Sequence, residues 1–461
     1  MVKKVRSGAF LVLLLAVFLG MFVAFGPGVY NDSDQYLKMH IHREPLYPLF
    51  LAALRTVFPN GWLIVMGVIQ NIFAAVSIWL FADYIGERFD LNWLGEAVVV
   101  LICLAPHMVT KYFSALHLFM TNSVMSEALC LPLFTLFLLE CFKIFTEEKE
   151  RACKKAAVCS LFLAFLISLV RAQMMVTILI WLAVAGARIV LWPKNRWRRR
   201  TWQSPRNGKW KMRHLLIMVV IVAAVFILRT LAVKSYNLVF NGYFINNTYG
   251  TVNTLTNILY AADRENGERI RDQEAREFFF RMYDLAEGRR ANYKYAGSSL
   301  REKTEHIEAW HDTIKYEMIE DVFYQTYDKT VTSDYIIQNL MADETAGKII
   351  RGILPGCFFR WFGNYLLIAS YGAVRSIAVV HPLINWAAFF IYVSALALTL
   401  FVWRKDRENP AVPVMLISLL AILANVGAVS ITIMCLSRYM IYGFAPFYTG
   451  YFLLLFSLRK R

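Results

Sequence analysis

The residues of this sequence that are best suited to chemistry are two aspartates and three arginines, which stand far apart along the chain. Asp32 and Asp34 share one short polar stretch, and Arg43, Arg171 and Arg438 stand in others. A carboxylate can accept the proton of an attacking hydroxyl group. A guanidinium can bind a phosphate through two hydrogen bonds and offset the charge that develops on it. This set therefore suits the transfer of a group from a phosphate ester to a hydroxyl.

Four further polar residues accompany this set, and we expect them to contact substrate. They are Tyr36, Glu127, Gln173 and Tyr439. Each feature also has an ordinary structural explanation. The aspartates could cap a helix, Glu127 could be an acid at a helix N-terminus, and the arginines could anchor helices at lipid headgroups. The sequence alone leaves these alternatives open.

Neither a metal ion nor any other cofactor is expected. His40 and His42 could act as metal ligands in an extended loop, but no third strong ligand stands at a fixed spacing from them. The chain has no glycine-rich phosphate-binding loop and no Cys-x-x-Cys pair.

Long apolar helices must position these residues. Of the 461 residues 58% are hydrophobic and 18% are charged, whereas soluble domains are about half apolar and about a quarter charged. Several stretches reach about 20 apolar residues, enough for a helix to cross a hydrocarbon core of about 30 Å. We therefore predict an all-α polytopic membrane protein with ten transmembrane helices. The predicted spans are 8–26, 61–82, 92–108, 124–145, 155–171, 173–192, 214–233, 383–403, 411–433 and 440–458.

The basic residues set the expected orientation. Nine of them and no acidic residue lie between Lys194 and Arg213. Cytoplasmic loops carry an excess of Lys and Arg, so we predict that this loop and both termini are cytoplasmic. The same pattern accounts for the formal net charge of +16 without a nucleic-acid partner. The expected location is the plasma membrane of a bacterial cell, in contact with membrane lipids.

This orientation defines three expected domains. They are a transmembrane module at 1–233 with a catalytic outer loop at 27–60, an extracytoplasmic, mainly helical domain at 234–382, and C-terminal transmembrane helices at 383–461. Residues 352–380 contain apolar runs but also Arg360, Asn364 and Arg375. Counting residues 352–380 as an eleventh span would place the basic residues at 404–407 outside, against the charge pattern. Helices that lie at the outer interface are therefore favoured for residues 352–380.

With this topology the acidic and basic residues of the candidate site share one side of the membrane. Asp32, Glu127, Arg171 and Arg438 each stand at the outer end of a predicted span. Ionisable groups close to a bilayer are costly to place, so their presence together indicates a functional site.

Five short motifs in this order resemble a known family. They are Asn31-Asp32-Ser33-Asp34-Gln35-Tyr36, Arg43-Glu44-Pro45-Leu46-Tyr47-Pro48, Met125-Ser126-Glu127-Ala128-Leu129, Leu169-Val170-Arg171-Ala172-Gln173 and Ser437-Arg438-Tyr439. Together they resemble the C-type (GT-C) glycosyltransferase superfamily, which includes protein O-mannosyltransferases and lipid A aminoarabinose transferases. The resemblance covers residues 1–233 and 383–461 and does not extend to the domain between them.

The resemblance implies a general-base aspartate in the first outer loop and a polyprenyl-phosphate sugar donor. In that family the acid commonly precedes a tyrosine by four positions, which matches Asp32 with Tyr36 and makes Asp34 the second choice. Arg171, Arg438 and Arg43 would then bind the donor phosphate. No acidic pair stands in this loop, because a serine follows Asp32. The acceptor, which could be a glycan, a lipid or a protein, therefore need not be a protein hydroxyl.

Two other functions compete with this interpretation. A transporter or flippase of lipid-linked saccharides would show broken helices, repeated halves and charges at mid-membrane depth. The sequence shows neither repeats nor clusters of charge within its apolar spans. A polymerase or assembly subunit without chemistry of its own is the third possibility.

Overall fold

The computed structural model describes residues 2–30, 32–112, 117–191, 208–378 and 382–459. Regular structure in these ranges is helical, and their one β-type pairing is a single bridge between Gly28 and Ser123. The prediction of an all-α fold is thus confirmed. Most of the basic loop, residues 194–207, lies outside the described ranges.

Nine helices in the described part of the chain are long and apolar enough to cross a membrane. Their candidate spans are Arg6–Phe25, Trp62–Arg88, Trp93–Tyr112, Glu127–Thr146, Ala172–Leu191, Lys211–Asn241, Ala387–Lys405, Ala411–Thr432 and Ser437–Arg459. Their length and hydropathy indicate an integral membrane protein.

Two segments differ from the predicted pattern of spans. The predicted span 155–171 corresponds to α7 (Glu150–Ser168), which is not among the nine. Its first two turns carry four ionisable residues, which shorten its uncharged stretch. Residues 352–377 form no separate interfacial helix, since they continue α14 (Tyr335–Ile377), a helix of 43 residues with Pro355 inside it.

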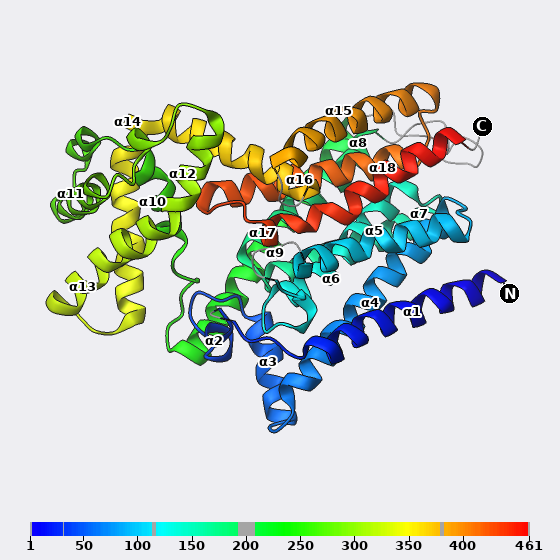
Figure 1. The fold of residues 1–461 in the computed structure, drawn as a ribbon, viewed down its shortest axis with the longest axis horizontal. Helices are drawn as coiled ribbons and strands as arrows, with labels where there is room; N and C mark the ends of the chain where they lie inside the picture. Colours follow the sequence, from blue (N-terminus) through cyan, green and yellow to red (C-terminus); the bar gives the residue numbers. More distant parts are fainter. Residues whose placement is uncertain (1, 31, 113–116, 192–207, 379–381, 460–461) are drawn as a thin grey trace. The chain divides into compact units, whose positions relative to one another are not determined.

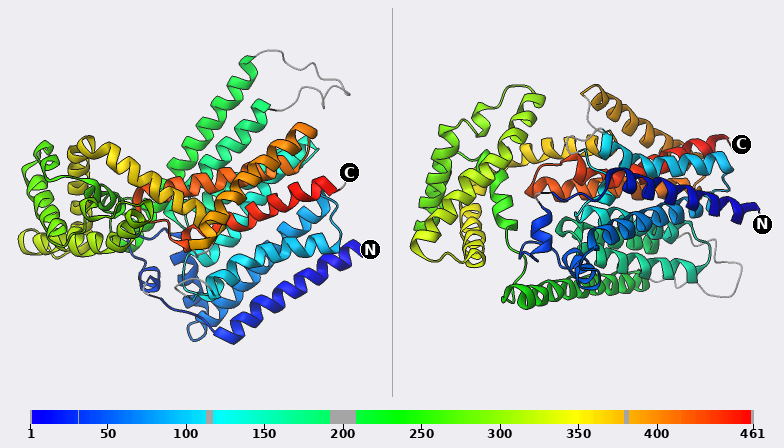
Figure 2. Two further views of the ribbon diagram at one scale, coloured as in Figure 1. Left: turned by 45° about the horizontal axis from the view of Figure 1, so that its top comes forward. Right: turned by 60° about the horizontal axis from the view of Figure 1, so that its bottom comes forward.

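The chain divides into two compact units, and the first contains most of the apolar helices. This unit comprises residues 1–245, 376–425 and 440–461. Its helices are α1 (Val2–Phe25), α2 (Ser33–Leu37), α3 (Leu46–Val57), α4 (Trp62–Arg88), α5 (Trp93–Tyr112), α6 (Glu127–Thr146), α7, α8 (Val176–Leu191), α9 (Gly208–Asn241), α15 (Pro382–Lys405), α18 (Phe444–Arg459) and most of α16 (Ala411–Thr432). The start of α1 and the end of α18 lie at one end of this bundle, and the short α2 and α3 lie toward the other (Figures 1 and 2).

The second unit comprises residues 246–375 and 426–439. Its helices are α10 (Gly250–Ala261), α11 (Gln273–Gly288), α12 (Leu300–Thr313), a π-helical turn at Ile314–Glu320, α13 (Asp321–Thr330), α14 to Arg375, the end of α16, and the start of α17 (Ser437–Met440). Its core is aromatic: Phe278 lies 4.9 Å from Phe323 and 5.5 Å from Tyr327 between ring centroids. These rings stand among charged residues in the sequence, and burying them gives this polar segment a fold of its own.

Side chains of α14 bond to other helices of this unit at several points along its length. The Asp343 carboxylate accepts hydrogen bonds from the backbone N–H groups of Tyr249, Thr251 and Val252 around the start of α10. Thr345 bonds the Tyr327 hydroxyl of α13 at 3.0 Å. Further along, Lys348 forms an ion pair with the α11 N-cap, Asp272, at 3.0 Å.

Candidate functional site

Backbone hydrogen bonds join four distant segments of the first unit. The Gly28 N–H donates to the Asn122 carbonyl at 2.9 Å, and the Val124 N–H donates to the Gly28 carbonyl at 2.8 Å. The Leu46 N–H donates to the Leu169 carbonyl at 2.9 Å. The stretch after α1 is therefore joined to the stretch before α6, and the stretch before α3 to the stretch after α7, independently of their functional side chains.

Arg43 and Asp32 form an ion pair in this region. The Arg43 Nη2 donates to Asp32 Oδ1 at 2.9 Å, and its Nε donates to Gln35 Oε1 at 2.8 Å. Although Asp32 directly precedes α2, its side chain makes no capping hydrogen bond to that helix. Ser33 organises the local turn, since its hydroxyl accepts from the Tyr30 N–H and donates to the Val124 carbonyl, each at 2.8 Å. The Asp32 carboxylate thus faces a guanidinium and does not satisfy a helix end.

Tyr36 connects this ion pair to the start of α6. Its hydroxyl accepts from Arg43 Nη1 at 3.2 Å and shares a hydrogen bond of 3.0 Å with the Ser126 hydroxyl. Burial raises the pKa of Tyr36 above its usual value, and the nearby Arg43 charge only partly opposes this effect. Tyr36 is therefore a neutral phenol at physiological pH, able to donate and accept hydrogen bonds.

Glu127 and Arg171 form a second ion pair, which is more deeply buried. Arg171 Nη1 lies 2.6 Å from Glu127 Oε1, and the Glu127 side chain is only 2% exposed. Arg171 also donates to the Ser126 hydroxyl at 3.3 Å and to Gln173 Oε1 at 3.2 Å. Ser126 bonds both members of this pair and also Tyr36, which accepts from Arg43, so the contacts from Asp32 to Gln173 are continuous.

These contacts define a group that we call the polar cluster. Its members are Asp32, Gln35, Tyr36, Arg43, Ser126, Glu127, Arg171 and Gln173. Six of them are candidate site residues from the sequence, and they come from four separate stretches of chain. Asp34 is not a member: its side chain is 62% exposed and pairs with Lys38, four residues along, at 2.7 Å.

Arg438 and Tyr439 belong to the second unit. Arg438 Nη2 donates to the Tyr439 hydroxyl at 2.6 Å. Asp312, also in this unit, has a pKa below its usual value, chiefly because of a hydrogen bond from the neighbouring His311, with the charges of Lys315 and Arg438 adding to the effect. Arg438 thus contributes positive charge near a carboxylate of the second unit.

A buried ion pair that the sequence analysis missed supports the polar cluster. Glu44, next to Arg43, accepts from Arg229 Nη2 of α9 at 2.5 Å, and the two side chains are 4% and 10% exposed. Such a pair needs compensation for the cost of removing both charges from water. The sequence does contain a signal for this pair. Arg229 is a single arginine inside an otherwise apolar run, and such a residue by default marks a functional or structural role.

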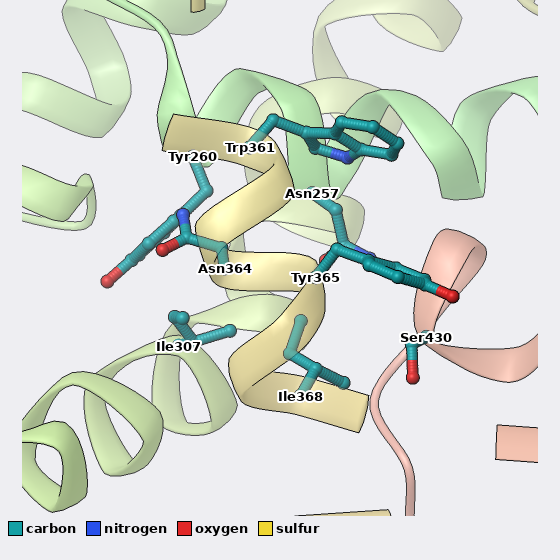
Figure 3. A pocket seen from close by; sticks show the side chains of 8 residues that line it. All are labelled: Asn257, Tyr260, Ile307, Trp361, Asn364, Tyr365, Ile368 and Ser430. Carbon is teal, nitrogen blue, oxygen red and sulfur yellow. The ribbon is translucent and has the colours of Figure 1, made fainter. Parts of the chain in front are cut away.

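Among the described residues no group of three or more His, Cys, Asp or Glu side chains could hold a metal ion. The His40 and His42 rings lie against each other, with centroids 4.1 Å apart. A shallow pocket in the second unit is lined by aromatic and amide side chains, including Tyr260, Trp361 and Asn364 (Figure 3).

Comparisons with models of protein families, with curated proteins and with solved structures gave no match.

Proposed function

We propose that this chain is a membrane glycosyltransferase that moves a sugar from a polyprenyl-phosphate donor to an acceptor hydroxyl at the outer face of the membrane. The observation that carries the proposal is the polar cluster, in which two carboxylates and two guanidinium groups from separate stretches of chain lie in one hydrogen-bonded set. The motif resemblance described above supports the same assignment.

In the proposed reaction the acceptor oxygen attacks the anomeric carbon of the donor sugar. Its proton passes to the Asp32 carboxylate. The bond between the anomeric carbon and the phosphate oxygen breaks, and the polyprenyl phosphate leaves with the bonding electrons. Arg43 and Arg171, which both belong to the first unit, are the proposed ligands of this phosphate. A guanidinium has five N–H donors, so the ion pair of Arg43 with Asp32 leaves donors for a phosphate.

The remaining residues of the proposed site bind and orient substrate. Tyr36 offers a neutral hydroxyl next to Arg43, and Gln173 offers an amide next to Arg171. Glu127 holds the Arg171 guanidinium in place. Tyr439 is assigned to substrate binding beside Arg438. No metal ion or other cofactor is needed for any of these roles.

Release of polyprenyl phosphate tests the proposal. The full-length protein is reconstituted in vesicles with polyprenyl-phosphate sugars extracted from cells that lack the gene, and with the extracted acceptor fraction. We expect polyprenyl phosphate to appear with wild-type protein, and the donor to accumulate in the cells without the gene. If the lipid-linked sugar instead crosses the bilayer intact and no polyprenyl phosphate forms, the chain is a flippase and the proposed chemistry is wrong.

The proposed orientation makes its own prediction. A cysteine replacing Leu285, which is 39% exposed on α11 of the second unit, should react with a membrane-impermeant maleimide added to intact cells. The reason is the basic loop between Lys194 and Arg213, which should hold the start of α9 in the cytoplasm. The chain that follows α9, including α11, should then lie outside. The seven native cysteines are free thiols and mostly buried, so the unsubstituted protein gives the background. Labelling that requires permeabilised cells would contradict the orientation.

A further inference from the structure

An exposed apolar stripe runs along one face of α14 in the second unit. Its members are Pro355, Phe359, Phe362 and Leu366, and we call it the α14 stripe. Phe359 is 88% exposed, Leu366 49% and Phe362 41%. The spacing of four, three and four residues puts them on one side of a helix. Leu300 of α12 and Val331, which follows α13, are exposed singly, and single exposed residues need no explanation.

The two arginines in this part of α14 point away from the stripe. Arg360 Nη1 donates to the Ala261 carbonyl at 2.7 Å and to Asp263 at 2.9 Å. Arg375 is held by both carboxylate oxygens of Glu308 and by the Cys435 carbonyl. These arginines interrupt the apolar runs of this segment in the sequence. Because their charges are paired within the unit, neither Arg360 nor Arg375 interrupts the stripe.

The opposite face of the same helix packs on the end of a candidate membrane span. The Tyr365 hydroxyl lies 3.5 Å from the Gly427 carbonyl, and an added Cβ on Gly372 would lie 3.1 Å from Val426. Figure 3 shows Tyr365 directed toward Ser430. Val426, Gly427 and Ser430 belong to the span Ala411–Thr432. This part of α14 therefore packs beside the C-terminal end of that candidate span.

The chain beyond α14 leads back into the membrane. The helix ends at Ile377, and the next candidate span begins at Ala387. Ten residues cover at most about 35 Å even when fully extended. The C-terminal half of α14 is thus tied to the bilayer through its packing on α16 and through the chain that follows it.

We propose that the α14 stripe lies in the membrane interface and contacts the acyl chains and headgroups of bilayer lipids. Aromatic side chains are favoured at this depth, and a helix with one apolar face lies in the plane of the interface. The contact holds the second unit against the membrane surface. This inference does not depend on the reaction, because it rests on the exposure and packing of α14 alone.

Photocrosslinking in the full-length protein tests the inference. The photoreactive p-benzoylphenylalanine replaces Phe359 in one variant and Phe362 in another, so an aromatic ring is kept at each position. The matched control carries it at Leu300, which is 71% exposed on α12 of the same unit. Each protein is reconstituted in vesicles of phosphatidylethanolamine and phosphatidylglycerol and irradiated. We expect phospholipid adducts at both stripe positions, detected by mass spectrometry, and several-fold fewer at Leu300.

Every other outcome identifies a different occupant and overturns the inference. Crosslinked dimers would show that a second copy of the chain covers the stripe. Peptide crosslinks to residues 1–245 would show that the first unit covers it. Adducts that are as rare at Phe359 as at Leu300 would show that the stripe faces water.

Discussion

Replacing Asp32 with asparagine is expected to abolish sugar transfer and to leave the amount of folded protein in the membrane unchanged. Asparagine keeps the size of the side chain, and its carbonyl can still accept the hydrogen bond from Arg43. It removes the charge and the ability to take a proton. General-base catalysis contributes roughly 10²–10⁴-fold to the rate, so the loss should fall in this range. The measurement is the release of polyprenyl phosphate by purified protein in vesicles.

Asp34→Asn is the matched control for this experiment. The same chemical change falls two residues away, on an exposed side chain whose partner is Lys38. We expect it to retain near-normal transfer. If Asp34→Asn is the inactive variant and Asp32→Asn is not, the base is misassigned. If neither variant is impaired, the proposed mechanism is wrong.

Replacing Arg229 with alanine is expected to lower the free energy of unfolding by about 3–5 kcal/mol, the range found when one partner of a buried ion pair is removed. The substitution takes away the guanidinium 2.5 Å from the Glu44 carboxylate, which stays buried. Transfer should also fall in the folded fraction, since Glu44 precedes α3 and adjoins Arg43. Unfolding by a denaturing detergent, followed by circular dichroism, gives the stability.

The double variant Glu44→Leu/Arg229→Leu separates the charge effect from lost packing. Replacing both members of a buried pair with apolar residues is often neutral or stabilising, so we expect the double variant to be more stable than Arg229→Ala. A double variant as unstable as the single one would assign the loss to packing. An Arg229→Ala protein as stable as wild type would show that the pair contributes nothing.

The membrane spans could be predicted from the sequence because their signal is local. A run of about 20 apolar residues needs no knowledge of the rest of the chain. All nine candidate spans overlap predicted ones; Ser437–Arg459, for example, begins three residues before the predicted 440. The tenth predicted span, 155–171, has no counterpart among the nine, because the corresponding helix α7 begins with charged residues.

The polar cluster could be predicted only in part. Placing the ends of apolar runs on one side of a membrane was enough to associate Asp32 with Glu127 and Arg171. It could not separate Asp32 from Asp34, because that choice depends on where the Ser33 hydroxyl bonds. Nor could it pair Glu44 with Arg229, which are 185 residues apart. Contacts of this kind are set by how helices pack, and no local pattern records them.

The length of α14 gives it a mechanical role within the second unit. At about 1.5 Å per residue, its 43 residues form a rod whose early turns hold α10, α11 and α13 and whose late turns hold the end of α16. A stiff rod transmits displacement, so a tilt that begins at the span end moves the far helices by a larger distance. A shift at the end of α16 is therefore passed along α14 to α10, α11 and α13.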